Sequence, residues 1–507
     1  MHDDGRPAAS LRERVFSGMA WSLLQTFGSR ALSMIIMLVL ARVLGPSAFG
    51  IVTIAFVILG ALTSLVDLGL GDILVRRLPQ DQTDYDSAFW VVLAFSLVLA
   101  GGTVAAAGML ADILEQPLLP PLLWILAATL PLAALELIQG ARMRAEMKFK
   151  PLALRTLAAT AVGGVVGIGM AFGGAGYWSL LAKGLVESAV SVLLMWKSCS
   201  YRPGLQFSWA RWRELFASAW HLLGGRLLDI VNQRFDAFVV SARLGPAVLG
   251  LYAASQRLYS TSMETLFATV NRVTLPAFAQ MRGDAERMQR SLLRLVSVTS
   301  FFTFPIFAAL GILAEPLIVT MLGAAWSGAA PVLSALCVGG LLFSVSHFNA
   351  PLFNSTGRTD LLFRLMLANA TLIVAAVSLG SLWGIVGVAL GFALRGYLLL
   401  PLNLAYLRRA IGLAPRRWLT TIAPPLLATA VSAALLATAQ WLLLPHLAAP
   451  WRLLMLALLF PLLHASAALL LIPGRVALVL DELTQLRPVL GRAADAVRRW
   501  QALLRGH

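Results

Sequence analysis

The protein has 507 residues, of which 59% are apolar and 13% are charged, and its formal net charge is +16. Soluble globular proteins carry about twice that share of charged residues, so the composition excludes this class. The positive charge does not indicate nucleic-acid binding, because the basic residues lie in short segments between long apolar blocks. The two cysteines, Cys199 and Cys337, indicate neither a disulfide framework nor a metal site.

The apolar blocks are about 20 residues long, which is the length of a helix that crosses a bilayer. They predict an all-α polytopic membrane protein with fourteen spans, near residues 17–41, 49–74, 87–111, 118–139, 152–173, 175–196, 214–241, 247–271, 295–320, 327–348, 361–382, 384–406, 419–441 and 451–473. If the N-terminus is cytoplasmic, the cytoplasmic segments hold 30 of the 40 basic residues and the opposite loops hold three. This asymmetry follows the positive-inside rule and predicts that both termini are cytoplasmic.

The first two predicted spans contain polar side chains that hydrocarbon does not favour. Ser22, Gln25 and Ser29 form one stripe along the first span, and Arg30 lies on its flank. Asp67 lies in the second span. Because an ionisable group in hydrocarbon is costly, such residues usually face a cavity or a partner.

The segments that follow combine acidic, glycine-rich and paired charged residues. The stretch "DYD" at residues 84–86 resembles a metal-binding acidic pair, but no nucleotide-binding segment surrounds it, so we expect a solvated loop. Glycines at residues 163, 167, 169 and 173 predict close helix packing. Lys183 and Glu187, four residues apart, can neutralise each other. Asp72, Glu136, Arg155 and Asp236 lie near span ends, where we expect them to reach the membrane interface.

The seventh and eighth spans each gather polar side chains within one sector of the helix. The sectors contain Arg226, Asp229, Gln233 and Asp236 in the seventh span, and Gln256, Arg257, Ser260 and Glu264 in the eighth. Arg234 also lies in the seventh span, and Arg395 stands alone in the twelfth. Arg226 and Asp229 can alternatively form a purely structural pair.

Four spans with polar faces predict a hydrated cavity between them. Arg30, Arg234 and Arg257, with Arg226 nearer the cytoplasm, would attract an anion to this cavity. Asp67, Asp229 and Glu264 could bind a coupling proton or sodium ion. Gln25, Gln233, Gln256 and Arg395 are further candidates for its polar lining.

One phrase occurs twice in the chain. "ARVLGPSAFG" (41–50) recurs as "ARLGPAVLG" (242–250), so that each Gly residue of the first copy, Gly45 and Gly50, matches one 200 positions later. Six spans separate the copies, which gives them the same orientation and predicts a parallel repeat. We expect an N-terminal lobe at 1–213, a C-terminal lobe at 214–413, and two further spans with a basic tail at 414–507. That tail is either an interfacial amphipathic helix or a solvated segment.

The sequence contains no P-loop, and its six histidines lack metal-ligand spacing. The predicted outside loops are too short for a catalytic domain. We therefore expect no enzyme activity and no cofactor apart from a coupling H⁺ or Na⁺.

Several stretches resemble the polysaccharide transport family, the Wzx-like flippases of the multidrug/oligosaccharidyl-lipid/polysaccharide exporter superfamily. They are "ARVLGPSAFGIVTIA" (41–55), "LVDLGLGDILVRR" (65–77), "ARLGPAVLGLYAASQRL" (242–258), "TLPAFAQM" (274–281) and "FNSTGRTDLLFRL" (353–365). The resemblance implies two six-helix lobes around a central cavity, with spans 1, 2, 7 and 8 lining it. Related lipid II flippases use the last two of fourteen spans as a groove for the lipid tail, and spans 13 and 14 here are candidates for that role.

The resemblance implies a flippase that moves undecaprenyl-diphosphate-linked oligosaccharide units across the bacterial inner membrane by alternating access. In such cavities arginines meet the lipid diphosphate, and Arg30, Arg234 and Arg257 are the candidates by position. Expected partners are the lipid-linked oligosaccharide, membrane lipids, a polysaccharide polymerase and export proteins. The alternatives are a multidrug exporter of the same superfamily, a membrane enzyme that acts on a lipid-linked sugar, and a non-transporting scaffold.

Overall fold

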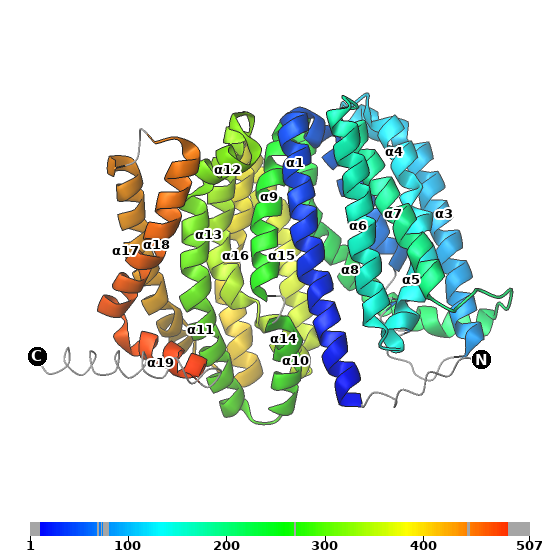
Figure 1. The fold of residues 1–507 in the computed structure, drawn as a ribbon. Coiled ribbons are helices and arrows are strands. Elements are labelled where there is room, and N and C mark those ends of the chain that lie inside the picture. Colours follow the sequence, from blue (N-terminus) through cyan, green and yellow to red (C-terminus); the bar gives the residue numbers. More distant parts are fainter. Residues whose placement is uncertain are drawn as a thin grey trace, which may run out of the picture. The chain divides into compact units, whose positions relative to one another are not determined.

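The structure is a computed structural model that describes residues 11–67, 70–71, 74, 81–267, 270–443 and 447–484. Every regular element among these residues is a helix (Figure 1). The prediction of an all-α protein is therefore confirmed. The predicted basic helix in the tail lies outside the described residues, beyond Thr484.

The chain forms two compact units, Met1–Ala253 and Ala254–His507, which divide within one helix, α9 (Pro246–Phe267). The helices before it are α1 (Leu11–Asp67), α3 (Gln82–Ile113), α4 (Leu119–Ala127), α5 (Thr129–Ala145), α6 (Phe149–Phe172), α7 (Trp178–Ser198) and α8 (Trp209–Leu244). Those after it are α10 (Val270–Gln280), α11 (Ala285–Ile312), α12 (Ala314–Leu322), α13 (Ala330–Ser346), α14 (Asn349–Ser355), α15 (Thr359–Gly380), α16 (Gly384–Ile411), α17 (Pro415–Leu443), α18 (Ala449–Leu471) and α19 (Pro473–Thr484). The lobe boundaries at residues 213 and 413 were predicted from the sequence repeat, and the division into these two units does not test them. They stay a prediction.

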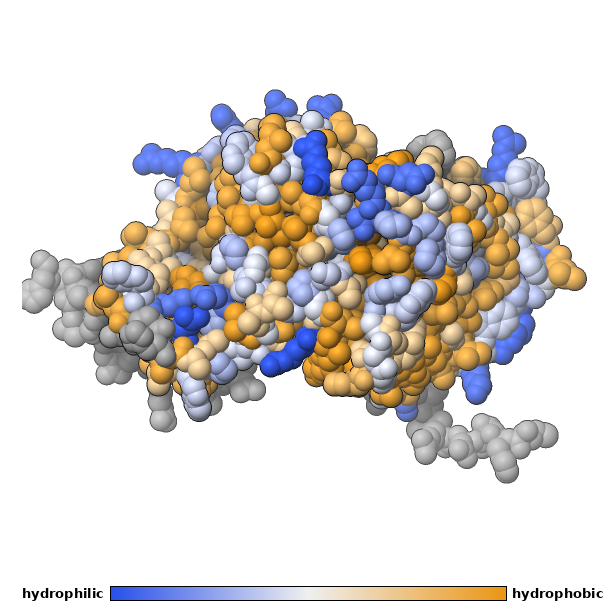
Figure 2. Space-filling view, turned by 90° about the horizontal axis from the view of Figure 1, so that it is seen from above, coloured by the Kyte–Doolittle hydropathy of each residue, from blue (hydrophilic) through white to orange (hydrophobic). Residues whose placement is uncertain are grey.

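Ten helical segments among the described residues are long and apolar enough to cross a membrane. Two of them, Ser17–Asp67 and Thr359–Ile411, each include two of the predicted spans. α8 and α9 are outside the ten, and each of them has one of the polar faces predicted from the sequence. The described helices are thus consistent with fourteen spans, and the protein is a multi-pass membrane protein. Apolar residues cover much of the face shown in Figure 2.

The repeated Leu-Gly-Pro phrase has the same backbone conformation in both copies. Gly45 breaks α1 into two helices with φ of 76°, and Gly245, between α8 and α9, has φ of 84°. Residues with a side chain rarely adopt positive φ, which explains why glycine stands at both positions. The repeat therefore encodes a sharp turn between two helices in each copy.

The two copies also contact each other within the first unit. A methyl group built on Gly50 would lie 1.7 Å from the carbonyl oxygen of Pro246, and one on Gly250 would lie 2.1 Å from that of Pro46. The proline carbonyl of each copy thus lies in the space that a side chain would fill if the glycine of the other copy were replaced. This reciprocal contact holds α1 against the junction of α8 and α9, and it supports the predicted parallel repeat.

Glycines on α6 allow the close approach of α7, as the spacing predicts. A methyl group on Gly163 would lie 2.8 Å from the carbonyl oxygen of Lys183, and one on Gly167 would lie 2.7 Å from the Cβ of the same lysine. Both distances are too short for a real contact. The absent side chains therefore place the charged face of α7 directly against α6.

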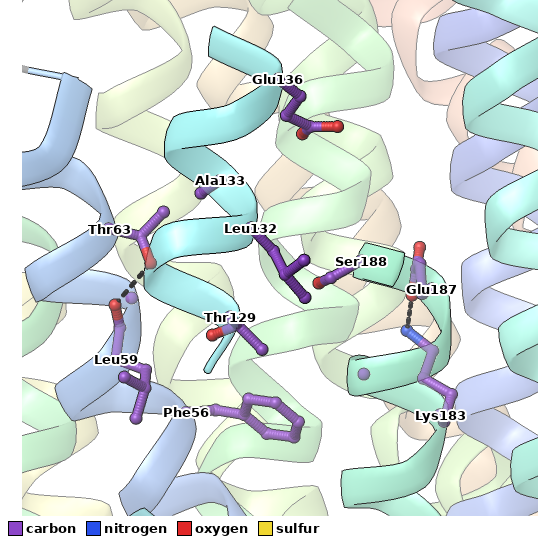
Figure 3. Close-up of a pocket in the computed structure, with 12 residues that line it drawn as sticks. Phe56, Leu59, Thr63, Thr129, Leu132, Ala133, Glu136, Lys183, Glu187 and Ser188 are labelled. Carbon is purple, nitrogen blue, oxygen red and sulfur yellow. Dashed lines mark hydrogen bonds and ion pairs between the residues drawn. The ribbon is translucent and has the colours of Figure 1, made fainter. Parts of the chain in front are cut away.

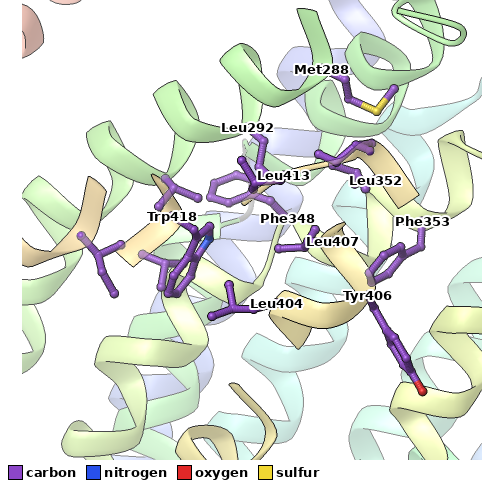
Figure 4. Close-up of a cluster of buried hydrophobic side chains, with 14 of the residues drawn as sticks. Met288, Leu292, Phe348, Leu352, Phe353, Leu404, Tyr406, Leu407, Leu413 and Trp418 are labelled. Carbon is purple, nitrogen blue, oxygen red and sulfur yellow. The ribbon is translucent and has the colours of Figure 1, made fainter. Parts of the chain in front are cut away.

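The second unit has its own apolar core. Met288 and Leu292 of α11 meet Leu352 of α14, Leu407 of α16 and Trp418 of α17, and all five are buried (Figure 4). This cluster ties the ends of four helices together. Its burial supplies the hydrophobic stabilisation that these helix ends need.

Candidate functional site

A small cavity of about 140 Å³ lies between α1 and α8 in the first unit. It is lined by Ala61, Ser64, Asp229, Ile230, Gln233 and Arg234. Three residues predicted from the sequence thus come together at one place. α1 contributes only small side chains here, so the polar side chains of α8 determine the chemistry of the cavity.

Arg234 approaches α1 at a glycine. A methyl group on Gly60 would lie 3.3 Å from Nη2 of Arg234, so the guanidinium group rests against the α1 backbone. The side chain is exposed, and it makes no hydrogen bond or ion pair with the described part of the chain. A guanidinium group has five N–H donors in a fork that matches phosphate or carboxylate oxygens. The geometry of this site therefore suits an anion.

The polar residues of α1 lie in different surroundings. The Gln25 side-chain amide donates to the Thr156 hydroxyl on α6 at 3.0 Å, so it links two helices of the same unit. Arg30 is half-buried and has an interaction partner. Asp67 accepts a hydrogen bond from the Gly71 backbone N–H at 3.3 Å. The side chain of Arg226 lies outside the described residues.

The predicted residues of α9 lie in the second unit. Arg257 and Glu264 are exposed, and Gln256 is half-buried with a buried Oε1 that accepts no hydrogen bond in the described structure. Their meeting with Arg234 in a shared cavity stays a prediction.

Arg395 is a buried residue of the second unit, only 7% exposed. Its guanidinium carbon lies 4.1 Å from the ring centroid of Phe392 and 5.3 Å from that of Phe343. Desolvated cation–π contacts of this kind stabilise a packed core. The surroundings of Arg395 therefore favour a packing role over a place in a cavity lining.

A larger cavity of about 360 Å³, not predicted from the sequence, lies inside the first unit. α1 contributes Phe56, Leu59 and Thr63, while α5 and α7 form the other walls (Figure 3). Glu136, Lys183, Glu187 and Ser188 supply polar groups to these walls.

The ionisable groups of this cavity form two pairs. Arg155 Nη1 donates to Glu136 Oε2 at 2.9 Å, and the Ser191 hydroxyl donates to the same oxygen at 2.6 Å. Lys183 Nζ lies 2.5 Å from Glu187 Oε2, which confirms the predicted pair. Glu136 and Arg155 pair with each other across α5 and α6, and their position at the membrane interface stays a prediction. No single-helix pattern in the sequence signals this cavity, because three helices form it.

Contrary to the expectation for a residue near a span end, Asp236 does not reach the surface of the protein. It is 1% exposed, and its Oδ2 accepts a hydrogen bond from the Tyr252 hydroxyl at 2.6 Å. The pair links α8 to α9 beside the repeated phrase, and it therefore belongs to the helix junction rather than to a cavity.

The "DYD" stretch belongs to α3 and not to a solvated loop. Asp86 is fully buried, and its Oδ1 accepts a hydrogen bond from the Tyr201 hydroxyl at 2.7 Å. Burial and this bond raise the pKa of Tyr201. Nearby, Glu146 is bonded by Lys148 and Arg142, which lowers the pKa of its carboxyl group. The bond between Tyr201 and Asp86 fixes the segment between α7 and α8 to the start of α3.

An apolar groove of about 720 Å³ lies in the second unit. α11 contributes Phe301, Pro305 and Ile306, and α18 contributes Phe460 and Leu453, with further apolar residues from α12. Among the described residues, no cluster of three or more His, Cys, Asp or Glu side chains is placed to hold a metal ion.

The fold is similar to the folds of two solved membrane proteins. It is similar to the lipid II flippase MurJ in an inward closed conformation, with a TM-score of 0.68 and 16% identity over 89% of this chain and 98% of that one. It is also similar to an inward-facing multidrug resistance MATE family transporter of the MOP superfamily, with a TM-score of 0.62 and 15% identity over 76% of this chain and 94% of that one. These likenesses confirm the predicted fold class.

Sequence comparison identifies the family. The chain is 29% identical to lipopolysaccharide biosynthesis protein WzxC of Escherichia coli K12 over 76% of its length and 79% of the relative. It is also 29% identical to succinoglycan biosynthesis transport protein ExoT of Rhizobium meliloti, over 73% of this chain and 75% of that one. A model of the polysaccharide biosynthesis protein family matches residues 39–331, and the chain belongs to this family.

Proposed function

We propose that the protein is a flippase that moves undecaprenyl-diphosphate-linked oligosaccharide units across the inner membrane for exopolysaccharide or lipopolysaccharide biosynthesis. The fold of a lipid II flippase and the names of the two relatives support a transporter rather than an enzyme. The observation that carries the proposal is Arg234, an exposed guanidinium group held against α1 in a membrane-spanning part of the chain.

The diphosphate of the carrier lipid is the anion that this arginine would bind. Arginine forms bidentate, charge-assisted bonds with phosphate oxygens, and these bonds strengthen where water is scarce. Arg30, Arg226 and Arg257 are further candidates, since each lies on a helix with a polar face. In alternating access, the head group would enter from the cytoplasm, bind these arginines and leave on the outer side.

The apolar groove along α11 and α18 suits the polyprenyl tail. It has a large volume, and among the described residues that line it only His464 and Ser262 are polar. A tail held there would avoid water throughout the cycle. The resemblance to lipid II flippases points to the last two spans, and the groove involves the second of them.

Coupling to a proton or sodium ion is assigned to Asp67, Asp229 or Glu264. Asp229 is the best placed of the three, because it lines the same small cavity as Arg234. A cation bound there would weaken the attraction of the arginine for a phosphate. The proposed orientation has both termini in the cytoplasm, and the proposed protein partners are a polysaccharide polymerase and the export proteins.

The MATE-like fold keeps a second candidate function open, the export of drugs. A site for cationic drugs would present acidic groups, whereas the group most available in the α1–α8 cavity is a guanidinium. This difference favours the anionic lipid as substrate over a cationic drug.

Transport can be tested in proteoliposomes by measuring which leaflet holds the lipid-linked oligosaccharide. The protein is reconstituted with a labelled undecaprenyl-diphosphate oligosaccharide, and an external glycan-modifying enzyme reports how much of the inner-leaflet pool becomes accessible. The wild type should expose this pool, and Arg234→Ala should slow the exposure at least about tenfold, as expected for the loss of one charge-assisted phosphate contact. Arg213→Ala is the matched control, since it removes the same charge from α8 about 30 Å away along the helix. Equal rates for both variants would refute the role of Arg234.

A further inference from the structure

The cavity between α1, α5 and α7 is not needed to bind a diphosphate. Its two carboxylates are already neutralised, Glu136 by Arg155 and Glu187 by Lys183. An anionic ligand in this cavity would be repelled by the two carboxylates, and a cationic ligand would compete with Arg155 and Lys183 for them. The charge balance of the walls therefore favours a ligand without net charge.

The polar groups of the cavity offer both donors and acceptors. The Thr160 hydroxyl donates to Glu187 Oε1 at 2.7 Å, and the carboxylate keeps further lone pairs. Ser188 projects into the open space from α7 (Figure 3). A ligand rich in hydroxyl groups can both donate to these carboxylates and accept from the lysine and serine.

The third feature is an aromatic wall. Phe56 lines the cavity and is 39% exposed, which leaves much of its ring open to a ligand. Small-ligand sites combine apolar and aromatic walls with a few placed polar groups, in volumes of about 300–1,000 Å³. The cavity of about 360 Å³ falls within this range and is much larger than a single ion requires.

The cavity adjoins the guanidinium group of Arg234 through one residue. Gly60 lines the cavity, and it is the residue against which Arg234 Nη2 rests. A ligand that bridges Gly60 would place one end beside the arginine and the other among the paired charges. The chemical order diphosphate then sugar, as in a glycosylated carrier lipid, matches this arrangement.

From this geometry we infer that the cavity between α1, α5 and α7 is a sugar-binding subsite that takes a monosaccharide unit next to the diphosphate. The inference rests on the proposed function, because it assigns the glycan part of the same substrate. Phe56 contacts one face of the sugar ring, while Glu136, Glu187, Lys183 and Ser188 bond its hydroxyl groups. The subsite gives a loaded carrier an advantage over the empty carrier.

The test compares the binding of radiolabelled undecaprenyl diphosphate with that of the same carrier bearing glucose, galactose or N-acetylglucosamine. The purified full-length protein should bind at least one loaded carrier about tenfold more tightly than the empty one, which is the discrimination expected of a few placed polar contacts. Ser188→Phe fills the cavity and should bring this ratio close to one without weakening the empty carrier. Phe56→Leu keeps an apolar side chain but removes the aromatic ring, so the protein should still fold and the ratio should fall several-fold.

Two controls separate the possible failures. Leu193→Phe adds the same ring to an exposed position of α7 and should leave the ratio unchanged. Arg234→Ala should weaken loaded and empty carriers alike. If the wild type binds the empty carrier but does not prefer any loaded one, or if Ser188→Phe and Phe56→Leu keep the preference, the subsite is refuted while the flippase stands. If the wild type binds neither carrier, the proposed function itself fails.

Discussion

The contact between the two repeat copies can be tested by adding a single methyl group. In Gly50→Ala, the new Cβ would lie 1.7 Å from the carbonyl oxygen of Pro246, and in Gly250→Ala 2.1 Å from that of Pro46. An ordinary contact requires 3.4 Å or more. Because the obstructing atoms belong to the backbone, no side-chain rotation can relieve the overlap. The helices have to move apart by roughly 1.7 Å and 1.3 Å respectively, which are the differences between these distances.

The cost of this movement follows from the loss of packing around it. A gap of 0.5–1 Å already removes about a quarter to a half of the dispersion attraction between facing atoms. Overpacking in proteins typically costs about 1–3 kcal/mol, and an overlap with backbone lies at the upper end. We therefore expect each variant to lose about 3 kcal/mol. At about 2–4 °C per kcal/mol for a unit of this size, the apparent Tm should fall by about 6–12 °C.

The assay is thermal unfolding of the purified protein in detergent, followed by tryptophan fluorescence. Gly224→Ala is the matched control, because it lies on α8 and a methyl group there meets nothing within 4 Å. The double variant should lose less than the sum of the two single losses, since the first substitution already separates the helices that the second would press apart. A Gly50→Ala protein as stable as Gly224→Ala would refute the reciprocal contact.

Three further predictions concern the first unit. Gly163→Ala should lower the apparent Tm, because its methyl group meets a backbone carbonyl of α7 at 2.8 Å. Gly169→Ala, on the same helix, meets nothing within 4 Å and should leave the Tm unchanged. Equal effects of the two substitutions would contradict the close packing of α6 and α7. Tyr201→Phe should cost about 1–3 kcal/mol in unfolding experiments, because it removes the shorter of the two hydrogen bonds that the buried Asp86 Oδ1 accepts, the other coming from the Gln82 amide at 3.3 Å. Tyr177→Phe serves as the control, and no difference between the two variants would disprove the bond. The lowered pKa of Glu146 means that its contribution to stability is complete above its ordinary pKa of 4.5 and is lost as the pH falls through the lower folded value. In Glu146→Gln, the Tm should therefore fall less steeply below pH 4.5 than in the wild type. The difference should correspond to less than about 1 kcal/mol, because the pair is partly exposed. The same fall of Tm in both proteins would count against this ion pair.

The sequence predicts the spans and the repeat because both depend on local patterns. The length and composition of an apolar block determine whether it can cross a membrane, and glycine at positive φ explains Gly45 and Gly245 without reference to distant residues. The pairing of Lys183 with Glu187 is likewise local, since the two residues lie one helical turn apart.

Features that depend on which helices are neighbours could not be predicted in this way. Helical periodicity assigns Glu136 and Arg155 to faces of two different helices, but it does not reveal that these faces meet. Arg395 illustrates the same limit, because a lone arginine in a span is compatible with a cavity lining or with a cage of aromatic rings. The sugar-sized cavity arises from three helices, and a single-helix pattern contains no sign of it.

The repeat contact and the proposed site are connected through α1. Gly60 lies ten residues beyond Gly50 on the same helix, about 15 Å along its axis, and it is the residue that Arg234 approaches. A helix segment moved at Gly50 also moves Gly60 relative to α8, because α-helices are stiff over this distance. Gly50→Ala should therefore slow the exposure of the lipid-linked oligosaccharide in proteoliposomes even at temperatures well below its Tm. Gly163→Ala, which disturbs α6 and α7, is the comparison, and its effect should fall on the preference for loaded over empty carrier. If Gly50→Ala transports at the wild-type rate when folded, the crossing of the two repeat copies stabilises the protein without setting the geometry at Arg234.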